Sequence, residues 1–424
     1  MSLNKINNYI IAIILISVFN IGLLDLLGID SYMVRLLIDC LLLLVIVCNF
    51  FRKISWIYIT IVFYILLALI IVSFLLSEVS AFSLFLFIRT FIIPILFLLS
   101  IKNINKINIS KIDRLLNILF IEQIIASIIK LIVHGRGEDY IGAMSIYAGE
   151  LATVFPLLAI SFYFTKYLYS NNLKYLLITP FFLIISYSSL KFGTIIYLPI
   201  IFIFNYLIWF WNQNISRKYL INFIKQIFSY GCILLLLFYV LVRLNPRANP
   251  ERKVGGTFDI NYLYNFSNDY TNKFKLVEGN LQTGRLAAFK IYFQDLTKKP
   301  LKFILLGNGP GSIQKTSLIK TNYDNFKANY GYGSKLGIIW LTEQIGLLGL
   351  FAFSLFQILI YVKIARYSNS ENFYSIYSKV VILIFFIDFF TYSSSFILSL
   401  TLSTYFYLII IMSLYNKKET IAKY

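Results

Sequence analysis

Long apolar runs most constrain what this chain of 424 residues can fold into. Stretches of roughly 20 residues with almost no charge recur along it, and this is the length that a helix needs to cross the hydrocarbon of a bilayer. Hydrophobic residues make up 59% of the chain and charged residues 13%, with a mean hydropathy of +0.77. A soluble globular protein cannot bury so much apolar surface. The sequence therefore predicts a polytopic membrane protein.

These apolar runs predict helices and not a β-barrel. Barrel strands alternate apolar and polar residues, and the runs here do not alternate. Backbone groups in lipid must form hydrogen bonds within their own segment, as a helix does. We therefore expect an all-α fold with about twelve transmembrane helices. They are expected near 9–27, 33–51, 54–76, 80–101, 114–134, 146–166, 173–190, 192–211, 227–243, 337–362, 380–396 and 398–415.

One long polar stretch, residues 244–336, interrupts the apolar pattern. It separates helices one to nine (1–243) from helices ten to twelve and a tail (337–424). Its first part, 244–282, is rich in Asn, Asp, Tyr and Gly, which predicts irregular backbone. The alternation of basic and non-basic connections places both termini in the cytoplasm and the polar stretch outside, because short cytoplasmic loops carry the excess of Lys and Arg.

The second part of the polar stretch carries a helical pattern. Thr283 fits an N-cap and Pro300 ends the segment. The Gly-rich residues 307–311 predict a simple turn, because they lack the lysine and Ser/Thr of a P-loop. The apolar residues of the expected helix recur at helical spacing and are Leu286, Phe289, Phe293 and Leu296.

The net charge of +19 does not indicate a nucleic-acid partner, because much of it belongs to the short basic loops. The cysteines form neither a disulfide framework nor a metal spacing, and His134 is the only histidine. No cofactor or metal is therefore expected. The first apolar run lacks a small-residue cleavage site, and we expect a spanning helix there.

Three cations are expected on the outer side. Arg285 opens the helix of the polar stretch, where free N–H groups and a guanidinium suit phosphate. The alternative is a solvated arginine. Arg136 lies just outside helix five, where it can instead pair with Glu138 or Asp139. Lys191 interrupts an apolar run at a tight outside turn, and snorkelling is its alternative role. Together the three fit an anionic ligand better than each does alone.

Charges inside the expected spans are costly and are functional candidates. Glu150 and Glu343 lie near the outer ends of helices six and ten, and a carboxylate removed from water can serve as a general base. Structural pairing with Arg285, Arg136 or Lys191 is the alternative for each. Arg35 and Asp39 are one turn apart and predict a structural pair. Pairing between helices is expected for Arg89, Glu122, Lys130 and Asp388.

Four segments, taken in order, resemble the O-antigen ligase and polymerase superfamily. Residues 136–156 resemble the family's arginine and small residues at the start of a helix. Residues 188–193 resemble a Ser-Arg-Gly turn, with Lys191 in place of the arginine. Residues 284–311 resemble its arginine, helix and Gly-rich turn, and residues 334–350 resemble the motif that opens the next helix. Together they cover roughly half of the chain.

This resemblance implies a GT-C-like fold and a metal-independent glycosyltransferase in the bacterial cytoplasmic membrane. Its substrates would be undecaprenyl-diphosphate-linked oligosaccharide repeat units. Ligases of the family have a His-Asn pair where this chain has Ser334 and Lys335, which favours a Wzy-type O-antigen or capsule polymerase. A ligase that transfers glycan to an acceptor lipid and a flippase for the lipid-linked sugar remain alternatives. Membrane lipids, a chain-length regulator and a flippase are the other expected partners.

The resemblance also suggests roles for single residues. Arg136 and Arg285 would hold the diphosphate as it leaves, and either Glu150 or Glu343 would accept the proton of the acceptor hydroxyl. The expected substrate-binding residues are Lys191, Lys335, Tyr332 and Ser334.

Overall fold

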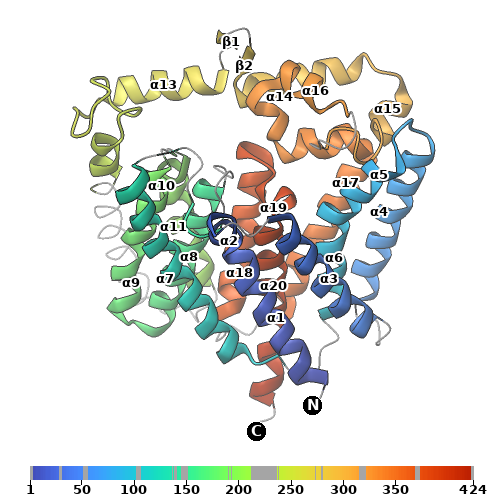
Figure 1. Ribbon diagram of the computed structural model, residues 1–424, viewed down its shortest axis with the longest axis horizontal. Coiled ribbons are helices and arrows are strands. Elements are labelled where there is room, and N and C mark those ends of the chain that lie inside the picture. Colours follow the sequence, from blue (N-terminus) through green and yellow to red (C-terminus); the bar gives the residue numbers. More distant parts are fainter. Residues whose placement is uncertain are drawn as a thin grey trace.

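The protein is almost entirely helical, and its helices stand side by side beneath an outer layer formed by part of residues 244–336 (Figure 1). The computed structural model describes residues 3–27, 31–50, 56–101, 107–135, 137, 141–144, 151–189, 191, 193–211, 236, 238–272, 274–277, 280–314, 321–367 and 373–421.

The first part of the chain forms helices of the bundle, with a π-helical segment, η1, and a 3-10 segment, η2. In chain order the elements are α1 (Leu3–Phe19), α2 (Ile21–Leu26), α3 (Ser31–Phe50), α4 (Ile57–Leu75), α5 (Ala81–Phe87), η1 (Ile88–Ile92), α6 (Ile93–Ile101), α7 (Ile109–His134), α8 (Leu151–Ser170), α9 (Leu173–Ile178), η2 (Thr179–Phe182), α10 (Leu183–Ser188) and α11 (Gly193–Trp211).

The outer layer contains α13 (Ile260–Asn272), β1 (Phe274–Val277), β2 (Asn280–Thr283), α14 (Arg285–Thr297), α15 (Leu301–Leu306), α16 (Tyr323–Tyr330) and the 3-10 segment η3 (Gly331–Lys335). The chain then returns to the bundle through α17 (Gly337–Tyr367), α18 (Phe373–Ile387), the π-helical η4 (Asp388–Tyr392), α19 (Ser395–Leu398) and α20 (Leu400–Ile421).

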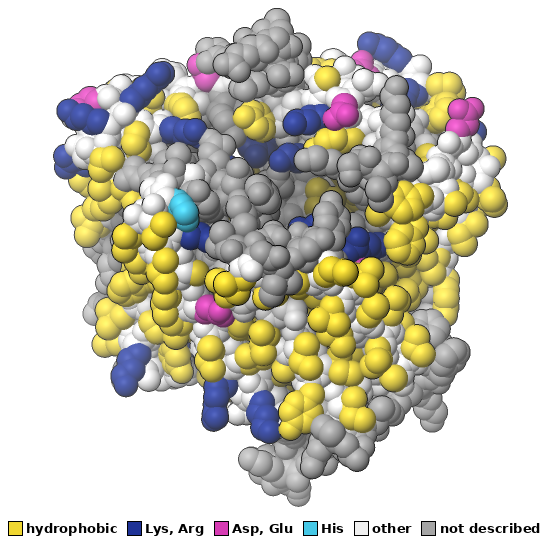
Figure 2. All heavy atoms as spheres, viewed as in Figure 1, with side chains coloured by type: hydrophobic (Ala, Val, Ile, Leu, Met, Phe, Trp, Pro, Cys, Tyr) yellow, Lys and Arg dark blue, Asp and Glu magenta, His cyan; other side chains and the backbone are white. Residues whose placement is uncertain are grey.

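Within the described residues, six helices are long and apolar enough to cross a membrane: Ile57–Leu75, Ala81–Ile101, Ile109–His134, Leu151–Ser170, Gly337–Arg366 and Phe373–Tyr392. Shorter apolar helices accompany them. Figure 2 shows an apolar band between two ends that bear charged side chains. The expectation of an α-helical membrane protein is thus confirmed, whereas the number of about twelve spans stays a prediction.

Aromatic side chains fill the centre of the bundle. Phe120 of α7 lies edge-on to Phe155 and Phe162 of α8, with ring centroids 5.4 and 5.1 Å apart. Close packing of this kind must hold the helices together, because in lipid the contact between apolar helices gains little from the hydrophobic effect.

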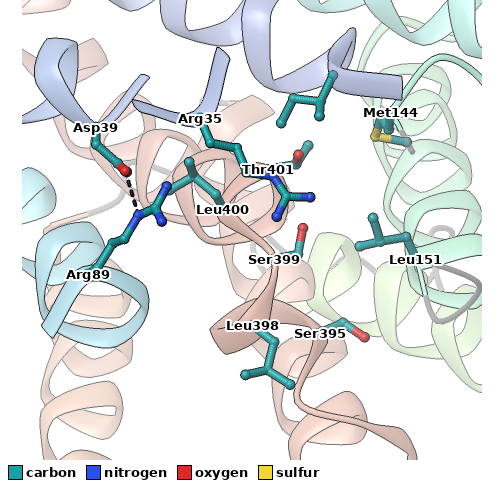
Figure 3. Close-up of a pocket in the computed structure, with 11 residues that line it drawn as sticks. Arg35, Asp39, Arg89, Met144, Leu151, Ser395, Leu398, Ser399, Leu400 and Thr401 are labelled. Atoms are coloured by element: carbon teal, nitrogen blue, oxygen red, sulfur yellow. Dashed lines mark hydrogen bonds and ion pairs between the residues drawn. The ribbon is translucent and has the colours of Figure 1, made fainter. Parts of the chain in front are cut away.

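One expected pair of charged residues, Arg35 with Asp39, is not the ion pair that the structure shows. Asp39 of α3 accepts a hydrogen bond from Nε of Arg89, on η1, at 2.5 Å (Figure 3), so its partner is on another helix and is not Arg35. This confirms that Arg89 pairs between helices. The carboxylate of Glu122 on α7 accepts a hydrogen bond at 3.4 Å from Asn20, the residue between α1 and α2.

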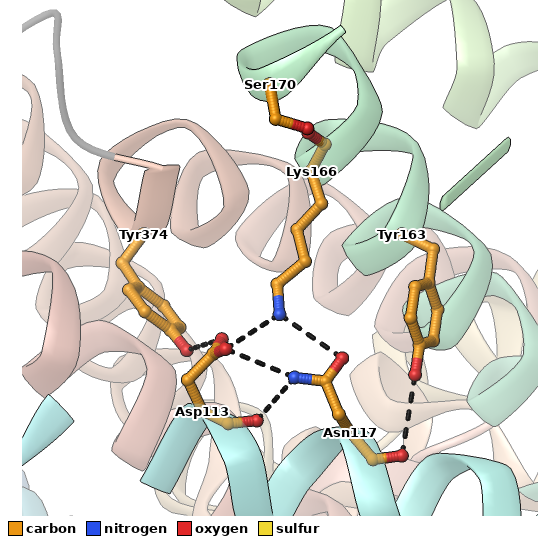
Figure 4. Close-up of polar contacts among 6 residues, drawn as sticks. All are labelled: Asp113, Asn117, Tyr163, Lys166, Ser170 and Tyr374. Atoms are coloured by element: carbon orange, nitrogen blue, oxygen red, sulfur yellow. Dashed lines mark hydrogen bonds and ion pairs between the residues drawn. The ribbon is translucent and has the colours of Figure 1, made fainter. Parts of the chain in front are cut away.

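A polar cluster joins three helices at the end of the bundle away from the outer layer (Figure 4). Lys166 of α8 forms an ion pair with Asp113 of α7 at 2.8 Å, and Tyr374 of α18 donates to the same carboxylate. Asn117 accepts from Lys166 at 3.2 Å. These residues border three of the basic connections, which therefore lie on one side. The start of α1 and the end of α20 lie at that end too (Figure 1).

A break in α17 anchors the outer layer. Gly346 has φ 68° and ψ −175°, and the Gly-rich turn packs against this point. Asn308 N–H donates to the carbonyl of Glu343 at 2.7 Å, and Gly309 N–H donates to that of Gln344 at 3.1 Å. Gly311 N–H donates to Gln344 Oε1 at 2.8 Å. The N–H groups of the turn thus donate to carbonyl oxygens of α17 near the break, and they are not directed at a phosphate. The prediction of a simple turn is confirmed.

Other expectations for the polar stretch were wrong. Residues 244–282 are not irregular throughout, because they include α13 and a strand of an antiparallel hairpin that pairs Phe274 with Thr283. Thr283 ends β2, and Gly284 is the N-cap of α14. The expected apolar face is rotated, because α14 packs against α16 and η3: Leu286 is 46% exposed and Leu296 is buried. The other buried residues of α14 are Ala287, Ala288 and Tyr292.

Candidate functional site

Arg285 is the first residue of α14, and one residue of η4 holds its side chain. Nε of Arg285 donates to the carbonyl oxygen of Tyr392 at 2.6 Å. The guanidinium carbon also lies 4.4 Å from the centroid of the Tyr392 ring, within range of a cation–π interaction. Gly284, the N-cap, provides no side chain to cap the first N–H groups of α14. A fixed guanidinium thus lies beside the positive end of a helix.

Tyr392 connects this arginine to the membrane bundle. Its hydroxyl accepts a hydrogen bond from Thr153 Oγ1, in the first turn of α8, at 2.6 Å. Its ring lies edge-on to Tyr197 of α11, with centroids 6.3 Å apart. The beginnings of α8, α11 and α14 therefore meet at the end of η4.

The turn that contains Lys191 packs against the same point. Lys191 N–H donates to the carbonyl of Ser186 at 2.9 Å, and Ser186 Oγ donates to Thr194 Oγ1 at 2.8 Å. Thr194 Oγ1 donates to the carbonyl of Thr153 at 3.1 Å. A Cβ on Gly193 would lie 3.0 Å from the Thr153 side chain and 3.2 Å from the Tyr392 ring. The expected break between two helices at 188–191 is confirmed, since α10 ends at Ser188 and α11 begins at Gly193.

A further backbone contact brings in the loop after α7. Gly137 N–H donates to the carbonyl of Ser188 at 3.0 Å. Arg136 and Glu150 lie outside the described residues, but their neighbours Gly137 and Leu151 belong to this region. Three segments that the sequence analysis singled out therefore converge: the loop after α7, the Lys191 turn and the start of α14.

The expected substrate-binding residues of η3 are next to the first turn of α14. The close approach of η3 to α14 requires Gly333, because a Cβ on this residue would lie 2.0 Å from Cβ of Ala288. Tyr332 is 40% exposed and Lys335 is half-buried. Ser334 is buried, and its hydroxyl donates to the carbonyl of Gly331 at 2.7 Å, so it stabilises its own turn.

Glu343 lies elsewhere. Its carboxylate forms an ion pair with Lys299 at 3.1 Å and accepts a hydrogen bond from Asn308. Lys299 follows the far end of α14, whose 13 residues span about 20 Å at about 1.5 Å per residue. Burial, with the nearby Glu343 carboxylate, raises the pKa of the Tyr292 phenol well above its usual value. Glu343 thus belongs to a buried structural pair, but its partner is Lys299 and not one of the three cations considered for it.

Tyr392 and Thr153 were not singled out from the sequence. The chain has 32 tyrosines, and tyrosine in an apolar run does not by itself indicate a site. The available signal was Asp388 in an apolar run followed by three serines, 393–395. Comparison with known proteins found no matching family model, no matching curated protein and no matching solved structure.

Proposed function

We propose that this protein is a membrane-embedded glycosyltransferase that polymerises lipid-linked glycans. In this proposal it transfers a growing chain from one undecaprenyl diphosphate to the sugar of another lipid-linked repeat unit, at the outer face of the cytoplasmic membrane. The fold would be GT-C-like, as the resemblance of the four segments implies. The observation that carries the proposal is the convergence of Arg285, the Lys191 turn and the loop after α7 around Tyr392.

The proposed chemistry needs a fixed positive charge where the leaving group departs. The acceptor hydroxyl oxygen bonds to the anomeric carbon of the donor sugar while the bond from that carbon to the diphosphate oxygen breaks. The diphosphate takes the electron pair, and Arg285 with the N-terminus of α14 stabilises the added charge. The hydroxyl proton passes to a base, for which Glu150 remains the candidate, since Glu343 is paired with Lys299.

Replacement of Arg285 tests the proposal. Purified Arg285→Gln protein supplied with lipid-linked repeat units should form polymer at least about 100-fold more slowly than the wild type, the loss typical of removing one transition-state donor. Lys290→Gln is the matched control, because Lys290 is an exposed cation on the same helix. Polymer length is measured on gels. An Arg285→Gln protein that polymerises at the wild-type rate would contradict the proposal.

The same assay separates the alternatives. A flippase would move lipid-linked sugar between leaflets but form no polymer ladder in detergent, where there is no second compartment. A ligase would transfer glycan only when a different acceptor lipid is added. Ladders formed from the repeat unit alone support the polymerase.

A further inference from the structure

A second cationic site lies in an open pocket between helices of the bundle, apart from Arg285. It is a pocket of about 200 Å³ between α3, η1, the start of α8 and the connection from α19 to α20 (Figure 3). Its polar lining includes Arg35, Arg89, Asp39, Ser395 and Ser399. This volume holds several water molecules or a phosphate-sized group.

The charges of the pocket do not cancel. Arg89 and Asp39 form an ion pair at 2.5 Å. Arg35, one turn before Asp39, points into the pocket and forms no hydrogen bond or ion pair with another described residue (Figure 3). Two guanidinium groups therefore face one carboxylate. Arg89 lies in the candidate span Ala81–Ile101, where Asp39 balances its charge. Arg35 on α3 is exposed and leaves the pocket with an excess of positive charge.

The N-terminus of a long helix adds to the positive potential. α20 begins at Leu400, which lines the pocket. Ser399 caps α20, because its Oγ accepts a hydrogen bond from Leu402 N–H at 3.4 Å. The positive end of the α20 dipole is thus at the pocket, and it acts together with Arg35 on an anion.

The lining also has an apolar part, which includes Met144, Leu151 and Leu398. A cationic group among aliphatic side chains suits an amphiphile with an anionic head. We propose that this pocket binds the phosphate or diphosphate headgroup of a lipid, with Arg35 as the principal ligand. Arg89 supports the charge and is kept in place by Asp39. This assignment does not rest on glycan transfer.

Binding measurements on full-length protein test the assignment. The protein is placed in phosphatidylcholine nanodiscs and carries Arg285→Gln, so that the outer arginine does not contribute. The probes are farnesyl diphosphate, inorganic pyrophosphate and farnesol, and binding is followed by calorimetry. Adding Arg35→Gln should weaken farnesyl diphosphate binding at least about tenfold, the effect of losing one charge-assisted contact. Arg35→Lys should retain most of the affinity.

Matched variants make the result decisive. Arg366→Gln removes an exposed arginine at the far end of α17 and should leave the affinity unchanged. The charge-balanced double variant Arg89→Gln with Asp39→Asn removes the ion pair but keeps Arg35, and should bind with at most a few-fold loss. Equal binding with and without the Arg35→Gln change would overturn the assignment. If pyrophosphate binds as tightly as farnesyl diphosphate, the site does not recognise the lipid chain. If farnesol binds as tightly as farnesyl diphosphate, the site does not recognise the anionic headgroup. Either result would overturn the corresponding part of the assignment.

Discussion

At the residue scale, the ion pair between Lys299 and Glu343 shows how a costly charge is accommodated. The Glu343 side chain is 10% exposed and that of Lys299 is 29% exposed, so the pair is largely removed from solvent. Asn308 of the Gly-rich turn donates to the same carboxylate. Any role of Glu343 as a proton acceptor would require this pair to open.

Removing both partners should therefore cost less than the sum of the costs of removing each one alone. Lys299→Met should lower stability by about 1–3 kcal/mol, because it leaves a buried carboxylate short of a partner. Glu343→Gln should cost a similar amount, and the double variant should cost less than the sum of the two. Thermal unfolding in detergent measures all three. Strict additivity would show that the two side chains do not interact.

The sequence identified some of these residues and not their partners. Arg285 was found because it precedes a helical pattern, and this needs only local information. Asp39 was assigned to Arg35 because the two are one turn apart, but its partner is Arg89. Spacing within one helix does not show which other helix faces it, so contacts between helices were missed.

At the element scale, the break in α17 depends on one glycine. A Cβ on Gly346 would lie 2.2 Å from the carbonyl oxygen of Leu305, and its φ of 68° with ψ of −175° is a conformation that is essentially confined to glycine. The same break receives the Gly-rich turn, so α15, the turn and α17 form one unit.

Gly346→Ala should destabilise this unit by about 1–3 kcal/mol from backbone strain, with the backbone clash adding to it. Gly255→Ala is the matched control: φ is +79° there, but no atom lies within 4 Å of the added Cβ. The midpoint of thermal unfolding should fall more for Gly346→Ala than for Gly255→Ala. Equal shifts would mean that the contact with Leu305 does not matter.

The positions of some helices of the bundle were predictable from the length of their apolar runs, but the helix expected at 9–27 is divided into α1 and α2. The helix expected at 33–51 is α3 (Ser31–Phe50), and that expected at 54–76 is α4 (Ile57–Leu75). The π-helical segments η1 and η4 were not predictable, because the flanking sequences are apolar on nearly all sides and show no stripe whose phase an extra residue would shift. Each carries a charged residue, Arg89 and Asp388, and such segments are frequent at functional sites.

At the scale of the whole molecule, the structure separates two ends. The outer layer lies at one end, and the cluster of Lys166, Asp113 and Tyr374 lies at the other (Figure 1, Figure 4). Because short basic loops accompany the second end, we predict that it is cytoplasmic.

Cysteine labelling of intact cells checks this orientation. The protein is first freed of its native cysteines. Asp324→Cys, exposed on α16, should react with a membrane-impermeant maleimide from outside. Lys174→Cys, exposed on α9, should react only after the cells are permeabilised. Reaction of both from the same side would contradict the arrangement, and reversal of the pattern would contradict the orientation alone.

The short segment from Asp388 to Ser395 touches both cationic sites. The Asp388 carboxylate accepts a hydrogen bond from Ser395, which lines the inner pocket, and Tyr392 holds Arg285 at the outer one. A headgroup that binds in the inner pocket and displaces Ser395 would therefore shift this stretch of backbone. The shift would move the Tyr392 ring, which contacts the Arg285 guanidinium. The affinities of the two sites for their ligands would then be interdependent, with equal effects in both directions.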